Sequence, residues 1–171
     1  IIMKVVEINN LVKKVQGLKK QKKKIILCHG VFDLLHPGHL RHFKEAKSHG
    51  DILIVSITSD KFVNKGPGRP YFNENLRMES LSNLRVVDFV TLNNTATAVN
   101  VIKKLRPHFY CKGQDYKNHK KDISGEIKNE VKAIKSVKGK IIYTKDITYS
   151  SGNLINRFYD LFSVSQKKYI N

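Results

Sequence analysis

The order of apolar and polar positions along this chain predicts helices and buried strands in succession. Over residues 4–21 the apolar side chains recur every three or four positions, which is the spacing of an amphipathic helix. Residues 25–28 form a short apolar run that ends at Gly30, typical of a strand buried on both faces of a parallel sheet. A helix is then predicted to begin at Pro37–Gly38 and to end before Gly50, since proline suits a first helical turn and glycine a helix end.

The same alternation continues toward the end of the chain. Further strands are expected at residues 52–57, 86–92, 108–111 and 140–143, and further helices at residues 74–83, 96–105, 126–137 and 151–162. Strands separated by helices indicate β-α-β units with right-handed crossovers. We therefore predict an α/β fold: a Rossmann-like, doubly wound, five-stranded parallel sheet in a single domain. Residues 1–23 would form an N-terminal amphipathic helix and basic linker, 24–162 the main domain, and 163–171 a C-terminal tail.

Composition narrows the class of protein. Of the 171 residues, 40% are hydrophobic, which is sufficient for a packed core. No apolar run is long enough to cross a bilayer and the opening residues lack a signal-peptide pattern, so we expect a cytoplasmic protein with no membrane partner. The two cysteines, Cys28 and Cys111, lack metal-ligand spacing and are interpreted as reduced, semi-buried thiols.

The formal net charge of +18 comes mainly from lysine, since only six of the 32 basic residues are arginine. A nucleic-acid-binding protein would more often show arginine, aromatic platforms and a basic stripe on one face. We therefore expect no nucleic-acid partner. A positive field would nevertheless attract triphosphates and sugar phosphates.

The most informative segment follows the first predicted strand. Residues 30–39 read Gly-Val-Phe-Asp-Leu-Leu-His-Pro-Gly-His, and a helix beginning near Gly38 would direct its free N–H groups and positive dipole end at this loop. His36 and His39 flank that helix end, where imidazoles can donate hydrogen bonds to phosphate oxygens. In isolation His-x-Gly-His would be two surface histidines, but its place between a buried strand and a helix favours a phosphate site. Zinc is disfavoured because no third Cys or His ligand lies at metal spacing nearby.

These residues resemble the signature of the cytidylyltransferase-like nucleotidyltransferase superfamily, and the resemblance extends from Lys24 to about Phe158. Within it the chain is similar to the adenylyltransferase domain that makes ADP-heptose from heptose 1-phosphate. The matching stretches are Lys-Gly-Pro-Gly-Arg-Pro at 65–70, Glu-Asn-Leu-Arg-Met at 74–78, Val-Val-Asp at 86–88 and Lys-Gly-Gln-Asp-Tyr at 112–116. The family's closing Ser-Thr-Thr segment is matched by Thr-Tyr-Ser-Ser at 148–151, where a Ser and a following Gly-Asn depart from the usual pattern.

Motif and resemblance together give a predicted site. The catalytic residues are His36, His39 and Lys65. The nucleotide-binding residues are Gly30, Val31, Phe32, Asp33, Gly38, His39, Arg77, Lys112, Gly113, Asp115, Tyr116, Thr148, Ser150 and Ser151. The resemblance implies that Lys65 is a mobile cation that closes on the phosphates and that Arg77 lies near them. Glycine next to Lys112 permits close approach, and Asp115 can accept from a base amine or a ribose hydroxyl.

Each of these positions also has an ordinary structural interpretation. Gly-Pro-Gly after Lys65 is common turn chemistry, and Gly-x-Asp before Tyr116 suits a turn as well. Arg77 could lie on a solvated helix face, and Ser150 and Ser151 could simply cap the last helix.

The predicted reaction transfers a nucleoside monophosphate, with AMP from ATP expected, to a phosphorylated small acceptor such as heptose 1-phosphate. The acceptor phosphate attacks the α-phosphorus in line and pyrophosphate leaves, without a covalent enzyme intermediate. Mg²⁺ on the triphosphate is the expected cofactor. No direct protein ligand to the metal is assigned. Asp33 is a candidate for one of two roles, orienting the loop or positioning the metal. The resemblance also implies a homodimer and a domain related to proteins fused to a sugar kinase.

Three alternatives remain open from the residues. A CTP-dependent cytidylyltransferase acting on glycerol phosphate, phosphocholine, phosphoethanolamine or another polyol phosphate would share the same motif. Class I aminoacyl-tRNA synthetases also carry a His-x-Gly-His loop, but the chain is too short for an anticodon module and lacks a clear Lys-Met-Ser-Lys-Ser-like loop. A non-catalytic regulatory domain is disfavoured because the chemical positions are intact.

Overall fold

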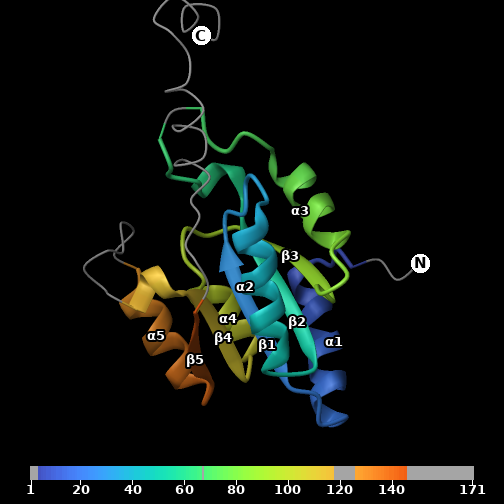
Figure 1. The fold of residues 1–171 in the computed structure, drawn as a ribbon. Coiled ribbons are helices and arrows are strands. Elements are labelled where there is room, and N and C mark those ends of the chain that lie inside the picture. Colours follow the sequence, from blue (N-terminus) through green and yellow to red (C-terminus); the bar gives the residue numbers. More distant parts are fainter. Residues whose placement is uncertain (1–3, 67, 118–125, 146–171) are drawn as a thin grey trace, which may run out of the picture.

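The computed structural model describes residues 4–66, 68–117 and 126–145 (Figure 1). Its helices are α1 (Ile8–Lys20), α2 (Pro37–Ser48), α3 (Glu74–Ser82), α4 (Val99–Leu105) and α5 (Ile127–Ser136), with short 3-10 turns η1 (Asp60–Phe62) and η2 (Gln114–Lys117). Its strands are β1 (Ile25–Gly30), β2 (Ile52–Thr58), β3 (Phe89–Asn93), β4 (Phe109–Gly113) and β5 (Lys140–Thr144).

The strands form one parallel sheet in the order β3-β2-β1-β4-β5, which confirms the predicted doubly wound, Rossmann-like α/β fold. Helices α2 and α3 cover one face, with α2 lying across β1 and β2 in Figure 1, and α1, α4 and α5 cover the other. The chain leaves β1 toward α2 on one face and β4 toward α5 on the opposite face. A crevice between the carboxyl ends of these neighbouring strands is where ligands bind in open α/β sheets.

Each face of the sheet has its own hydrophobic core. On one face, Leu11 and Val15 of α1 pack with Leu27 of β1 and with the apolar sides of α4 and α5. On the other, Phe43 of α2 packs with Cys28 and the remaining inward side chains of β1 and β2. Buried strands of this kind need apolar residues on both faces, which is why their sequences read as continuous apolar runs.

The first helix is shorter than its sequence pattern predicts. It begins at Ile8, because Glu7 adopts an extended conformation and its carboxylate caps the helix by accepting from two backbone N–H groups, those of Asn9 and Asn10. The residues before it run beside β3, where Val5 forms a parallel bridge with Val90. The apolar face of α1 is buried within this chain, so it gives no reason of its own to expect a dimer.

Two further boundaries differ from prediction. The third strand spans Phe89–Asn93 rather than residues 86–92, and α4 begins at Val99 rather than at 96. Asn93 is responsible for the second difference, because its amide donates to the carbonyls of Thr95 and Thr97 and holds that stretch as a loop. The helix predicted at 151–162 and the tail at 163–171 lie outside the described residues. None of the helices within the described ranges has the length and apolar character needed to cross a membrane.

Candidate active site

The predicted site residues gather where the sheet's strand order reverses. The register of β1 and β4 pairs Cys28 with Cys111, which brings Gly30 and Gly113 side by side at the carboxyl edge. A Cβ atom on Gly113 would meet nothing within 4 Å. The chain therefore leaves open space at the end of β4 for a ligand to approach its backbone.

His36 and His39 stand together at the start of α2. His36 is the N-cap residue in an extended conformation, and it makes no side-chain capping hydrogen bond to the helix. Its ring stacks on that of His39, with centroids 3.7 Å apart and planes at 26°. The N-terminal end of α2 and the two imidazoles thus form one surface suited to an anion, and phosphate binding there stays a prediction.

Both histidines are held in their neutral form. Burial, together with the nearby Lys65 ammonium, lowers the pKa of His36. For His39, burial and the charges of His36, His42 and Lys65 lower the pKa to about 3. The buried Nδ1 atom of His39 has no hydrogen-bond partner among the described residues. A neutral imidazole keeps one N–H donor, and an incoming phosphate would supply the negative charge that this surface lacks.

Phe32 packs against the histidine pair through its contact with His39. Its φ of 49° lies in the left-handed region, which costs about 1–2 kcal/mol for a residue with a Cβ. In this conformation its ring contacts the His39 ring edge-on, with centroids 5.4 Å apart. A Cβ on Gly30 would lie 3.1 Å from the Phe32 ring. Glycine at position 30 therefore makes room for the Phe32 ring, and its predicted nucleotide-binding role stays a prediction.

Asp33 fastens the Gly/Pro-rich loop to the histidine loop. Its two carboxylate oxygens accept from the backbone N–H groups of Tyr71 and Phe72, each at 2.9 Å, and Oδ2 also lies 2.9 Å from Arg69 Nε. The residue is 4% exposed. Its charge is thus already balanced within the protein. Of the two roles considered for Asp33, the structure supports orienting the loop.

Arg77 lies in a different environment from the predicted one. It is 1% exposed, and its guanidinium donates to the carbonyls of Val31, Thr58 and Phe72 and forms an ion pair with Asp60 at 2.6 Å. It therefore does not lie on a solvated helix face, and its predicted nucleotide-binding role stays a prediction. Arg77 instead holds the strained Val31–Phe32 backbone against the loop after β2.

Unlike Arg69 and Arg77, Lys65 is a cation outside the ion pairs described above. It lies in the segment between η1 and Arg69, followed by Gly66 with φ of 94° and Gly68 with φ of 68°, conformations that favour glycine. Although Lys65 as a whole is exposed, partial burial and the neighbouring Arg69 cation lower its pKa. It forms no ion pair with a carboxylate among the described residues. Its ammonium is close enough to act on both histidines.

Lys112, in contrast to Lys65, is buried and paired with a carboxylate. It is 7% exposed, and its ammonium lies 3.4 Å from Glu130 Oε2 on α5 and 4.1 Å from the centroid of the Tyr116 ring. Glu130 also accepts from the Tyr110 hydroxyl at 2.9 Å and from the Ala98 N–H at 3.0 Å. Sequence reasoning missed Glu130. A carboxylate on the apolar side of the predicted 126–137 helix, between Ile127 and Ile134, was the available signal.

Not every predicted residue is placed. Asp115 lies in η2 directly after Gly113, and only its backbone is described. Thr148, Ser150 and Ser151 lie outside the described residues, so their nucleotide-binding role stays a prediction. The approach to that segment is fixed, however: His42 Nδ1 lies 2.8 Å from Thr144 Oγ1 at the end of β5, and the backbone N–H of Lys145 donates to Glu45.

Several polar side chains outside the histidine loop have structural roles. His29 is buried, its ring hydrogen-bonds Ser56 at 3.2 Å, and burial lowers its pKa to about 3. His108 accepts from the Ile25 N–H through Nδ1. The thiols of Cys28 and Cys111 are free and fully buried, deeper than the semi-buried position expected.

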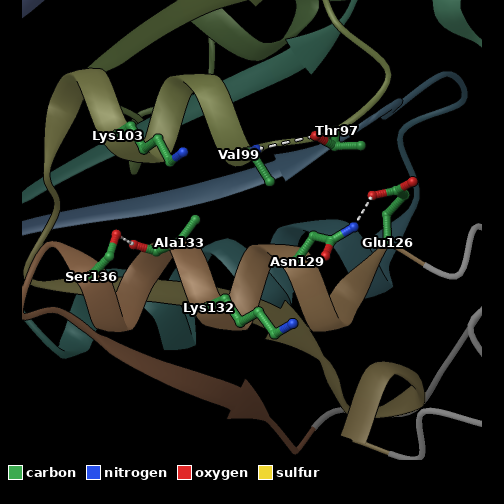
Figure 2. Close-up of a pocket in the computed structure, with 8 residues that line it drawn as sticks. All are labelled: Thr97, Val99, Lys103, Glu126, Asn129, Lys132, Ala133 and Ser136. Carbon is green, nitrogen blue, oxygen red and sulfur yellow. Dashed lines mark hydrogen bonds between the residues drawn. The ribbon is translucent and has the colours of Figure 1, made fainter.

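A separate groove of about 490 Å³ lies between α4 and α5 (Figure 2). Val99 and Lys103 line it from α4 and Asn129 and Lys132 from α5, so it contains none of the predicted site residues. The concave surface there does not bear on the chemistry of the histidine loop.

Comparison with known proteins agrees with this geometry. The family model described as cytidylyltransferase-like matches residues 27–158. "Bifunctional protein HldE" from Aliarcobacter butzleri is 39% identical over 137 residues, which is 78% of this chain and 28% of that protein. "Bifunctional protein HldE" from Helicobacter pylori is 36% identical over 131 residues, which is 75% of this chain and 28% of that protein. The chain thus spans less than a third of the length of these relatives.

Solved structures show the same fold. The lipopolysaccharide core biosynthesis protein from Thermoplasma volcanium has a TM-score of 0.61 and 26% identity, with 74% of this chain and 99% of that chain covered. The pantoate-beta-alanine ligase from Francisella tularensis has a TM-score of 0.59 and 22% identity, with 88% of this chain and 69% of that chain covered. At that identity the ligase supports the fold alone.

Proposed function

Because the chain belongs to the cytidylyltransferase-like family, a family of nucleotidyltransferases, we propose that it transfers the nucleoside monophosphate of a triphosphate to a phosphorylated sugar and releases pyrophosphate. We propose ATP as the donor and a sugar 1-phosphate such as heptose 1-phosphate as the acceptor. The relatives named bifunctional protein HldE support the choice of acceptor class, as does the resemblance of residues 65–70 and 112–116 to the ADP-heptose branch.

One observation carries the proposal: a pair of stacked neutral imidazoles at the free N-terminus of α2, facing a lysine that has no carboxylate partner among the described residues. Such a surface offers hydrogen-bond donors and positive charge, and the Asp33 carboxylate that offsets part of the Lys65 charge is itself engaged by Arg69 and two backbone N–H groups. Phosphoryl-group transfer needs this kind of positioning and charge stabilisation around the α-phosphate more than covalent participation by the protein.

The reaction then follows from the arrangement. The triphosphate lies over the α2 N-terminus, where His36 and His39 donate to its oxygens and Lys65 approaches from the Gly/Pro-rich loop. An oxygen of the acceptor phosphate attacks the α-phosphorus, and the bond to the pyrophosphate oxygen breaks. Negative charge grows on the leaving oxygens in the transition state, and the three side chains stabilise it there. No enzyme nucleophile is needed, since the acceptor phosphate is the nucleophile.

Magnesium enters this proposal as part of the triphosphate substrate. The described residues hold no group of three or more His, Cys, Asp or Glu side chains arranged for a metal. Asp33, the candidate for positioning the metal, has both oxygens engaged by Tyr71, Phe72 and Arg69. The ion would therefore be bound by phosphate oxygens and water, and the protein would contribute donors and cations around it.

The decisive experiment is pyrophosphate release measured with each of the four common nucleoside triphosphates, each paired with heptose 1-phosphate, glycerol phosphate, phosphocholine and phosphoethanolamine. Turnover with ATP and the sugar phosphate supports the full proposal. Faster turnover with CTP and a polyol phosphate replaces the donor and acceptor but keeps the reaction class. Absence of pyrophosphate release with every pair contradicts the proposed function.

The preference for ATP is expected to be moderate. A base pocket reads the exocyclic groups through a few hydrogen bonds, and a wrong base leaves buried polar groups unpaired at about 1–3 kcal/mol each. Lys112 and Tyr116 at the end of β4 belong to the segment that resembles the adenylyl branch. Calorimetric titration with ATP and with CTP, in the presence of Mg²⁺ and without acceptor, measures the difference directly.

We further propose that the chain forms a homodimer and corresponds to one functional unit of a larger, bifunctional arrangement that includes a sugar kinase. The second point is supported by relatives named bifunctional, of whose length this chain covers 28%. Light scattering at micromolar concentration tests the first, and a monomeric mass would contradict it.

A further inference from the structure

The carboxyl edge of the sheet carries charge very unevenly. At the α2 end, Lys65 forms no ion pair with a carboxylate among the described residues, and the two histidines beside it are neutral. At the β4 end, the equally cationic Lys112 is paired with Glu130, and both side chains are more than nine-tenths buried. These two ends lie on either side of the crevice between β1 and β4.

Glu130 is buried and has more polar partners than a carboxylate in a surface ion pair. Its Oε2 serves both the Lys112 ammonium and the Tyr110 hydroxyl, and its Oε1 accepts from the N–H of Ala98, the N-cap residue of α4. Burial and the Glu130 charge raise the pKa of Tyr110 well above its usual value, so this hydroxyl remains a donor. The carboxylate thus has a fixed position set by α4, α5 and β4 together.

The fixed carboxylate in turn fixes Lys112. The ammonium is held on the Glu130 side at 3.4 Å and lies 4.1 Å from the centroid of the Tyr116 ring, which is 37% exposed. A cation at this distance from an aromatic face is attracted by the ring and keeps it in place. Tyr116 therefore offers an exposed, anchored ring beside the open space at Gly113, while the charge beneath it is already neutralised.

On this basis we propose that Glu130 is a positioning residue that sets the direction in which the nucleotide binds. By neutralising Lys112 it leaves the α2 end as the one attractive to a triphosphate, and by holding Lys112 under Tyr116 it prepares the β4 end for the uncharged nucleoside. The inference rests on the proposed function, since it assumes that a nucleotide occupies this crevice. It assigns to Glu130, which touches no ligand, the control of orientation through Lys112.

The test compares inorganic tripolyphosphate with the nucleoside triphosphate that the protein prefers, both titrated by calorimetry. Glu130→Gln retains the size of the side chain and an oxygen for the Ala98 N–H, but leaves Lys112 as a second unpaired cation. Tripolyphosphate should then bind about threefold to fivefold more tightly, the scale of one partly screened charge contact. The preference for the nucleoside triphosphate over tripolyphosphate should fall by a similar factor, because the Tyr116 platform loses its anchor.

Two companion variants separate orientation from a general structural role. Glu126→Gln removes the same charge four residues earlier, next to α5, where the carboxylate contacts Asn129 rather than Lys112, and should leave both affinities unchanged. Lys112→Met with Glu130→Gln removes the uncovered cation and should return tripolyphosphate binding to the wild-type level. Thermal unfolding of each variant verifies the fold. If Glu130→Gln does not fold, Lys112→Met is used alone. This variant must weaken tripolyphosphate binding, because it leaves the Glu130 carboxylate without its cation.

The outcomes are distinct. If Glu130→Gln weakens both ligands in parallel, or changes neither, the orientation role is overturned while the proposed function stands. If the folded wild-type protein binds no nucleoside triphosphate and releases no pyrophosphate with any tested pair, the proposed function and this inference both fail.

Discussion

The cationic side chains around the crevice are held in two different ways. Arg77, Arg69 and Lys112 each lie beside a carboxylate, on Asp60, Asp33 and Glu130 respectively. Lys65 forms no such ion pair among the described residues, and it is close enough to the two stacked histidines to lower their pKa values.

The physical consequences of the two arrangements are opposite. A buried paired charge holds neighbouring segments together, and removing one partner leaves the other uncompensated. An exposed cation outside an ion pair adds no such cohesion, but it can approach an anion without first breaking an ion pair. We therefore expect variants of the paired cations to lose stability, and variants of Lys65 and the two histidines to lose turnover.

The largest effect is expected at Arg77. Arg77→Met removes a buried guanidinium that joins three backbone carbonyls to Asp60, and should lower the free energy of unfolding by about 3–5 kcal/mol. Arg77→Lys keeps the charge but not the planar array of donors, so its stability should lie between those of the wild type and Arg77→Met. Denaturant unfolding measures both variants. A stable Arg77→Met protein with reduced turnover would mean that Arg77 acts on the ligand, as Lys65 and the histidines are proposed to do.

The histidines should show the reverse behaviour. His36→Ala or His39→Ala is expected to lower turnover by about two to three orders of magnitude, the scale of losing one transition-state donor. The unfolding midpoint should change less than for Arg77→Met, because Arg77 is the more deeply buried side chain and carries a charge. Steady-state pyrophosphate release at saturating substrates is the measurement, and near-full turnover would remove these histidines from the catalytic set.

Lys65→Ala is expected to lower turnover by about one to two orders of magnitude with little change in stability, since a mobile exposed cation contributes somewhat less than a fixed donor. Lys61→Ala is the matched control: it removes an exposed lysine at η1 whose ammonium lies 5.7 Å from the Phe62 ring centroid. Equal losses for the two variants would show that the effect reflects overall charge rather than the position of Lys65.

The smallest effect concerns pH. Burial lowers the pKa of His29 to about 3, below the value near 6.5 of the unfolded chain. The unfolded state therefore binds its proton first as the pH falls, and the stability present above pH 6.5 decreases from there toward pH 3. For this residue the loss at pH 5 is about 2 kcal/mol relative to pH 8.

Chemical unfolding of the wild type and of His29→Gln at both pH values tests this sign. The variant should be less stable at pH 8 yet show a shallower decline toward pH 5. His49→Gln, at an exposed helix end, should leave the decline unchanged. A wild-type protein that gains stability on acidification would contradict the assignment of His29 as a neutral structural group.

Much of the fold could be predicted because it depends on local patterns. Runs such as 25–28 and 52–57 are apolar because both faces of a parallel strand are buried, and their spacing by helices admits few topologies. The errors fell where tertiary contacts override local preference. Val5 continues a helical spacing, yet it forms a bridge beside β3, and residues 96–98 are kept out of α4 by the Asn93 side chain.

The sequence by itself determined the family, the position of the histidine loop and the chemistry of its residues. These depend on side chains fixed in order along one short stretch, a buried strand that ends at Gly30 and a helix that begins at Pro37. It also predicted Lys65 as a catalytic cation and Lys112 as a nucleotide-binding residue, but not that Lys112 is paired with Glu130.

Only the tertiary structure decided which cations have partners. Asp33 reaches Arg69, Asp60 reaches Arg77 and Glu130 reaches Lys112 across 36, 17 and 18 positions of the chain, after the sheet has brought their segments together. Electrostatic pairing depends on distance and burial, which vary steeply over a few ångströms and are not encoded in any local pattern. The division between cations that are paired with carboxylates and Lys65, which forms no such ion pair among the described residues, therefore arises only when the chain folds.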